Sequence, residues 1–83
     1  MPYFVYLIVS KLKNKKKLSY VGYSKDLKKR LSLHNSGKGA KFTRGNKWKL
    51  VYYEKHDSKS DAMKNEYKLK KDYILRKKLI KNK

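Results

Sequence analysis

The chain has 83 residues, which is enough for one domain with one modest hydrophobic core. It carries 25 Lys and Arg against 6 Asp and Glu, a formal net charge of +19, and it has no cysteine, so disulfide staples and thiolate zinc sites are excluded. A surface this basic is screened by an anionic partner: nucleic acid, an anionic membrane or an acidic protein. Because 22 of the 25 basic residues are Lys, a merely solvated lysine-rich surface is the alternative.

The amino-terminal stretch predicts a buried strand, because β-branched and aromatic residues dominate from Tyr3 to Val9. Its roughly eight apolar residues are too few to span a membrane, and no basic leader or cleavage site marks a signal peptide. We expect the Lys-rich segment from Lys11 to Lys17 to be an exposed turn, and Leu18 to Tyr23 to be a second strand. The two strands form a predicted antiparallel hairpin, in a protein that we expect to be cytoplasmic.

A helix is predicted over residues 26–36, where leucines recur at helical spacings. Its N-cap is Ser24 or Asp26, since both side chains accept hydrogen bonds from a first helical turn. Gly37 or Gly39 ends it.

The next segment, residues 36–49, holds three of the four glycines and is predicted to be a loop. We expect Phe42 and Trp48 to anchor this loop to the core. Leu50 to Glu54 is the third predicted strand.

Ser58 followed by Asp61 has the spacing of a capping box and predicts a helix from about residue 59. Three residues mark its apolar face: Ala62, Leu69 and Tyr73. A turn near Lys71 or Asp72 separates it from a third helix, from Tyr73 to Ile80. The predicted order is β-β-α-β-α-α, an α+β fold in a single domain of residues 1–83.

Arg30 and His34 are four residues apart on the first predicted helix, so they share one face beside the leucine stripe. Such a pair is typical of the edge of a cleft, and also of a partly exposed helix flank. Spacing alone leaves both interpretations open.

Glu66 falls on the apolar face of the second predicted helix, four residues after Ala62 and three before Leu69. A carboxylate directed inward is unfavourable unless it is paired or bound to a metal. A salt bridge to a nearby Lys or Arg and a metal site both satisfy this condition.

Tyr6 and Tyr20 lie on the two strands of the predicted hairpin, where two hydroxyls can reach the same face. Tyrosine titrates near about pH 10, too high for an efficient base, so we expect positive charge or a metal-bound water to lower the pKa of an acting tyrosine. The alternative is that both are structural tyrosines. Gly22 marks either a close backbone approach with room for a phosphate, or the end of the strand.

Together and in this order, these residues resemble the GIY-YIG nuclease superfamily. The first motif is present as Phe4–Tyr6 and keeps only the tyrosine, and the second is present as Tyr20–Gly22 with Val at its centre. Residues 35–44 resemble the loop of the small stand-alone bacterial members, and the resemblance extends over residues 3–80. The family's helical Arg, its common His and its metal-binding Glu are matched by Arg30, His34 and Glu66.

The resemblance implies a small three-stranded antiparallel sheet flanked by helices, and metal-dependent hydrolysis of phosphodiesters. Glu66 would hold a single Mg²⁺ or Mn²⁺, with waters and substrate oxygens completing the shell. Arg30 would clamp the scissile phosphate, because its planar fork matches phosphate geometry and keeps its charge. Tyr6 or Tyr20 would activate or position the water, and His34 would assist proton transfer or hold a tyrosine.

The expected partner is nucleic acid, with DNA favoured over RNA, and not a membrane; the sequence predicts no oligomeric state. Lys29 is an additional candidate phosphate ligand. The basic residues of the following loop that we expect to bind nucleic acid are Lys38, Lys41 and Arg44.

Two departures from the family pattern stand out. Phe4 and Val5 replace the Gly and Ile of the first motif, which changes packing more than chemistry, and the Asn that many members carry on the last helix has its nearest match in Asn82. No appended DNA-binding domain is apparent, so we expect a structure-selective or weakly specific endonuclease. The alternatives are a non-catalytic nucleic-acid-binding module and a basic adaptor that docks on acidic protein.

Overall fold

The computed structural model describes residues 2–11 and 17–81. Most of the predicted Lys-rich turn, and Asn82, therefore lie outside the described residues. The elements confirm the predicted order β-β-α-β-α-α and are, in chain order, β1 (Tyr3–Lys11), β2 (Lys17–Ser24), α1 (Leu27–Asn35), a single 3₁₀ turn (Lys41–Thr43), β3 (Lys49–His56), α2 (Lys59–Lys71) and α3 (Tyr73–Lys81).

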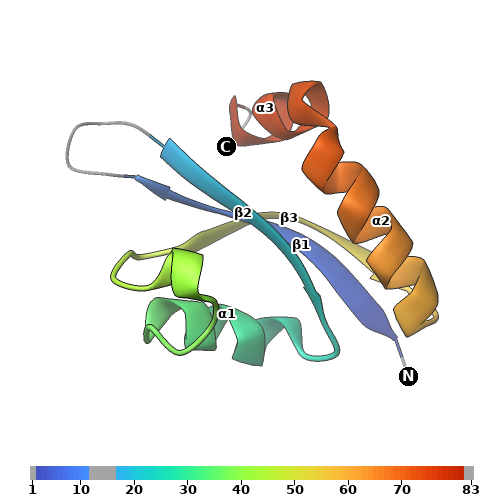
Figure 1. The fold of residues 1–83 in the computed structure, drawn as a ribbon, viewed down its shortest axis with the longest axis horizontal. Coiled ribbons are helices and arrows are strands. Elements are labelled where there is room, and N and C mark those ends of the chain that lie inside the picture. Colours follow the sequence, from blue (N-terminus) through green and yellow to red (C-terminus); the bar gives the residue numbers. More distant parts are fainter. Residues whose placement is uncertain (1, 12–16, 82–83) are drawn as a thin grey trace.

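The three strands form one antiparallel sheet in the order β2-β1-β3, so β2 and β3 are its edges. Alternate side chains of β1 point to opposite faces. α1 and the loop after it lie on one side of the sheet, and α2 and α3 lie on the other (Figure 1). The sheet therefore carries a hydrophobic core on each face.

The core beneath α2 and α3 contains Val5 and Leu7 of β1, with Ala62 and Leu69 of α2 packed on them. The core beneath α1 contains buried Tyr6, Ile8 and Trp48, with partly buried residues around them that include Tyr20, Leu27 and Leu31. No helix within the described ranges is long and apolar enough to cross a bilayer.

Local signals in the sequence place α1 where it was predicted. The Asp26 carboxylate accepts the backbone N–H of Lys29 at 3.0 Å, so Asp26 is the N-cap. After Asn35 the chain turns at Ser36, and Gly37 adopts a φ of +82°, a left-handed conformation that ends helices. These contacts fix the direction in which Arg30 and His34 leave the helix.

The boundaries of α2 also follow from capping residues. Ser58 Oγ accepts the backbone N–H of Asp61 at 3.1 Å at the start of α2. Asp72 ends α2, and its carboxylate accepts the backbone N–H of Leu75 at 3.0 Å at the start of α3. The predicted break near residue 72 is therefore confirmed.

Two expectations about core residues are wrong. Tyr73 does not mark the apolar face of α2, because the chain turns at Asp72, and the residue is 63% exposed at the start of α3. Phe42 is not a core anchor either, because the 3₁₀ turn directs Thr43 inward and leaves Phe42 54% exposed. Trp48 is buried as expected, and its indole N–H donates to the carbonyl of Thr43 at 2.8 Å.

Candidate active site

Tyr6 of β1 and His34 of α1 form a buried hydrogen-bonded pair beneath the first helix. The Tyr6 hydroxyl oxygen lies 2.7 Å from His34 Nε2, and both side chains are almost completely shielded from solvent. His34 is thus directed into the fold, and the alternative of a partly exposed helix flank is wrong for this residue. The imidazole connects helix and sheet through one polar contact.

Thr43 decides which nitrogen of His34 carries the proton. Its hydroxyl donates to the carbonyl of Ala40 at 2.8 Å, which uses its single hydrogen. The bond of 2.8 Å between Thr43 Oγ1 and His34 Nδ1 therefore has the imidazole Nδ1–H as donor. In the neutral ring Nε2 is then the acceptor, and the Tyr6 hydroxyl donates to it.

Burial keeps both members of the pair uncharged. It lowers the pKa of His34, and the positive charge of Arg30 lowers it further. Burial also raises the pKa of Tyr6, and the nearby Arg30 guanidinium offsets this only in part. Positive charge therefore does not lower the pKa of Tyr6 as expected, and its phenol donates a hydrogen bond to His34. The expected effect of a metal-bound water stays a prediction.

Two glycines leave room for the side chains of Tyr6 and His34. Gly22 lies inside β2 opposite Tyr6, and a Cβ there would overlap the hydroxyl end of the Tyr6 ring. A Cβ on Gly39 would overlap the ring of His34. Gly22 is thus not the end of its strand, and the close approach that it permits on this face is that of Tyr6.

Tyr20 and Arg30 lie beside the pair. The Tyr20 ring centroid is 6.5 Å from that of Tyr6 and 5.1 Å from that of His34, so both motif tyrosines share one face as predicted. Arg30 is half-buried, and its Nε is shielded from solvent without a hydrogen-bond partner among the described residues. A buried donor of a charged group without a partner is unfavourable in the free protein and fits an anion that arrives with a ligand.

Glu66 of α2 contributes the negative charge of the site. Its side chain is 20% exposed and its carboxylate lies 3.7 Å from Nζ of Lys70, which is 51% exposed. The charge of Glu66 also contributes to the raised pKa of Tyr6. The carboxylate is therefore not locked in a dry ion pair, and its field reaches the tyrosine.

The carboxylate of Glu66 is a ligand type that suits a hard cation. The part of the chain that the structure describes contains no group of three or more His, Cys, Asp or Glu that could hold a metal by protein ligands alone. Mg²⁺ and Mn²⁺ do not need such a group, because a single carboxylate with waters and substrate oxygens is a common arrangement for them. Glu66 is the residue that would hold such an ion.

The two sides of the sheet meet along its β2 edge. A groove of about 300 Å³ follows this edge and is lined by Ser19, Tyr20, Val21, Phe42, Lys70 and Arg76. The Phe42 ring lies 6.1 Å from that of Tyr20 at an interplanar angle of 22°. Groups from α2 and α3 therefore reach the same groove as the aromatic residues on the α1 side.

The other basic residues predicted to bind nucleic acid are exposed on the α1 side of the molecule. Lys29 is on α1, and the remaining three are in or next to the 3₁₀ turn after it: Lys38, Lys41 and Arg44. Their contact with nucleic acid stays a prediction.

Sequence reasoning missed Thr43 and Gly39, which hold the imidazole of His34 in place. Both lie in a segment without hydrophobic periodicity, and their contacts with His34 depend on the path of the loop. Neither residue type indicates such a role by itself.

We expect Thr43→Val to destabilise the protein by about 1–3 kcal/mol, because it leaves the buried His34 Nδ1–H and the Ala40 amide without their acceptor. Thr43→Ser keeps the hydroxyl and is the matched control. Denaturant unfolding of both variants measures the difference. Equal stability of the Val and Ser variants would show that the hydroxyl does not hold His34.

The chain matches a known protein family over most of its length. A family model described as the GIY-YIG catalytic domain matches residues 2–79. The chain belongs to the GIY-YIG family. The matched model describes a catalytic domain with a nuclease-type fold, and nucleases of this family generally use divalent metals.

Several GIY-YIG relatives are similar to this chain. A UPF0213 protein of Staphylococcus saprophyticus is 50% identical over 52 residues, which cover 61% of this chain and 63% of the relative. A UPF0213 protein of Streptococcus pyogenes is 55% identical over 56 residues, covering 66% of this chain and 61% of the relative. The chain thus aligns with somewhat less than two thirds of the length of these relatives. The solution structure of a UPF0213 protein from Bacillus halodurans matches the whole chain and 86% of its own length, with 35% identity and a TM-score of 0.50.

Proposed function

We propose that this chain is a structure-selective or weakly specific endonuclease that hydrolyses phosphodiester bonds of nucleic acid with one divalent metal, Mg²⁺ or Mn²⁺, and that DNA is its main substrate. The observation that carries this proposal is the Tyr6 hydroxyl, which lies 2.7 Å from an imidazole nitrogen free to accept its proton. Positive and negative groups, Arg30 and Glu66, act on the same hydroxyl.

In the proposed reaction Tyr6 relays a proton and never persists as a phenolate. The attacking water gives a proton to the Tyr6 oxygen as Tyr6 gives its own proton to His34 Nε2. The water oxygen bonds to phosphorus, and the bond from phosphorus to the leaving oxygen breaks. The leaving oxygen keeps the electron pair of that bond and takes up a proton from solvent. This relay suits a phenol whose raised pKa prevents it from ionising on its own near neutral pH. Thr43 keeps the acceptor nitrogen of His34 facing Tyr6.

Arg30 binds the scissile phosphate in this proposal. Its buried Nε has no partner among the described residues, so a phosphate oxygen would satisfy it and would meet a guanidinium that does not lose its charge. The phosphate also brings the negative charge that favours the imidazolium form of His34 during the transfer.

Glu66 would hold the divalent ion. A bound ion would neutralise the negative charge that develops on the phosphate and on the leaving oxygen. For this role Glu66 must exchange its long contact of 3.7 Å with Lys70 for the ion. Tyr20 forms the wall of the site next to Tyr6 and His34, where it positions the substrate.

The proposal is tested with purified protein and a panel of branched, nicked, single-stranded and duplex DNA and RNA substrates. We expect cleavage with Mg²⁺ or Mn²⁺ and none with EDTA. Glu66→Ala should lose cleavage and keep oligonucleotide binding, whereas Glu54→Ala, which removes a carboxylate from β3, should cleave normally. Undiminished cleavage by Glu66→Ala would show that the assigned metal site is wrong.

The second candidate function is nucleic-acid binding without catalysis, which the net charge of +19 favours. Phosphate neutralisation alone gives an affinity that falls with salt, with a log–log slope of about −0.9 per phosphate contacted on duplex DNA. Such a slope together with an absence of cleavage on every substrate of the panel would favour this function.

A further inference from the structure

A second groove lies between α3 and the first residues of β2, and we call it the α3 groove. It has a volume of about 350 Å³, and four of its lining residues are cationic: Lys17, Arg76, Lys77 and Lys81. None of the described residues that line it is acidic. A groove with this charge is complementary to a polyanion.

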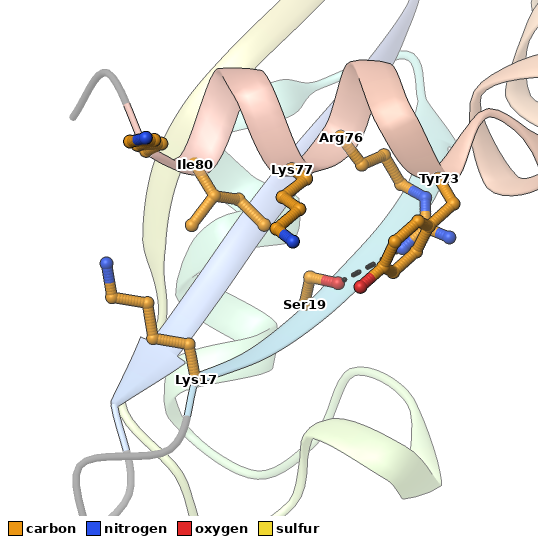
Figure 2. Close-up of a pocket in the computed structure, with 7 residues that line it drawn as sticks. Lys17, Ser19, Tyr73, Arg76, Lys77 and Ile80 are labelled. Carbon is orange, nitrogen blue, oxygen red and sulfur yellow. Dashed lines mark hydrogen bonds between the residues drawn. The ribbon is translucent and has the colours of Figure 1, made fainter.

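Arg76 is fixed at the inner wall of the α3 groove. Its Nε donates to the carbonyl of Leu69 at 3.1 Å, and one terminal nitrogen donates to Ser19 Oγ at 3.4 Å. Figure 2 shows this bond between the guanidinium and Ser19 across the groove. A guanidinium has five N–H donors, so most of them remain for phosphate oxygens after these two bonds.

Tyr73 presents an aromatic surface at the same place. It is 63% exposed, and the Arg76 guanidinium carbon and Lys77 Nζ lie 5.8 and 6.0 Å from its ring centroid. Figure 2 shows the Tyr73 ring beside the Arg76 guanidinium. An exposed ring between cations is the arrangement on which an unpaired base stacks while its phosphates are neutralised.

The α3 groove leads to the candidate active site. Ser19 and Arg76 line both this groove and the groove along the β2 edge, which contains Tyr20 and Phe42. Phe42 is 54% exposed and stacked against Tyr20, so it offers a second aromatic surface near Tyr6 and His34. Tyr73, Arg76 and Phe42 thus follow one another along the two grooves toward the buried Tyr6–His34 pair.

We propose that the α3 groove binds an unpaired strand of nucleic acid that flanks the scissile phosphate, with a base stacked on Tyr73 and phosphates on Arg76 and Lys77. This inference rests on the proposed function for the position of the scissile phosphate, and it adds the substrate class. Bases inside a duplex cover each other's faces, so a lone exposed ring selects a single-stranded tail, flap or gap over a blunt duplex.

The test measures binding of full-length protein to fluorescent oligonucleotides in EDTA at fixed salt. The probes are a single strand, a duplex with a single-stranded tail and a blunt duplex, each as DNA and as RNA. Tyr73→Ala should weaken binding of the single strand and the tailed duplex at least about fivefold, the loss expected for one stacked base. Binding of the blunt duplex should change little, and Tyr73→Phe should bind like the unmodified protein.

Matched controls lie on β3, at the opposite edge of the sheet. Tyr53 is 55% exposed there, and Tyr53→Ala removes a ring of similar exposure to that of Tyr73. Lys77→Gln removes one positive charge from the α3 groove. Its control is Lys55→Gln, which removes the same charge from an exposed position on the strand of Tyr53. The two groove variants should lose more affinity for single strands than the two controls.

Stacking of a base on Tyr73 can be measured separately from affinity, by fluorescence. A 2-aminopurine base in the bound tail should be quenched by the unmodified protein and by Tyr73→Phe, and not by Tyr73→Ala. Equal losses on tailed and blunt duplexes, equal losses in Tyr53→Ala, or a preference for anionic vesicles over all oligonucleotides would overturn the proposal. Because binding in EDTA needs no turnover, a chain that binds as expected and never cleaves would overturn only the proposed nuclease function.

Discussion

Tyr6→Phe is expected to slow single-turnover cleavage by about 10²–10⁴-fold, the usual contribution of a positioned acid or base. The substitution removes only the hydroxyl that lies 2.7 Å from His34 Nε2 and leaves the ring in the core. Oligonucleotide affinity should be unchanged, because the hydroxyl is buried and carries no charge. The measurement is a rate at saturating protein with Mg²⁺.

His34→Gln provides the partner for a double-mutant cycle. Glutamine can accept a hydrogen bond from Tyr6 and cannot take up its proton, so its rate should fall by a similar factor. Since the two residues act as one relay, the double variant should be no slower than the slower single variant. If the two fold losses of cleavage rate multiply in the double variant, Tyr6 and His34 act independently and the relay is contradicted.

Arg30→Met is expected to lower the cleavage rate by about 10²–10³-fold, as removal of one preorganised charge stabiliser usually does. It should also leave the free energy of unfolding unchanged or raise it by about 1 kcal/mol, because it removes a buried Nε that has no partner among the described residues. A residue that limits stability and supports the reaction is typical of a functional site.

Two comparisons make the Arg30 prediction specific. Lys29→Gln removes a charge from an exposed position one residue away on the same helix, and it should reduce affinity slightly and leave the rate at saturation unchanged. Removal of Arg30 should also raise the pKa of His34, because the positive charge of Arg30 contributes to its lowering. A large loss of stability in Arg30→Met, or rates equal to those of Lys29→Gln, would contradict the assigned role.

Much of the fold was predictable because its signals are local. Asp26, Ser58 and Asp72 each cap a helix through an N–H three residues later, a contact that sequence spacing encodes directly. The hairpin that brings Tyr6 and Tyr20 to one face follows from strand alternation in the same way. The face of Arg30 and His34 follows from helical periodicity.

The chemistry of the site was less predictable because it depends on packing between distant segments. The bonds of His34 to Tyr6 and Thr43 cross 28 and 9 residues of sequence, and only the folded loop shows which imidazole nitrogen carries the proton. The expectation that positive charge lowers the pKa of a site tyrosine was wrong for Tyr6, because burial outweighs the charge of Arg30. Nothing in the residue types alone shows how deeply a side chain will be buried.

The most direct test of the proton relay is nitrogen-15 NMR of the His34 imidazole, with His34→Gln used to separate its signals from those of His56. The pKa of His34 is lowered, so its ring stays neutral at a pH of about 6.5, which is the ordinary pKa of histidine. At that pH we predict a proton on Nδ1 and an unprotonated Nε2 that accepts from Tyr6. A proton on Nε2, or a doubly protonated ring, would contradict the proposed relay.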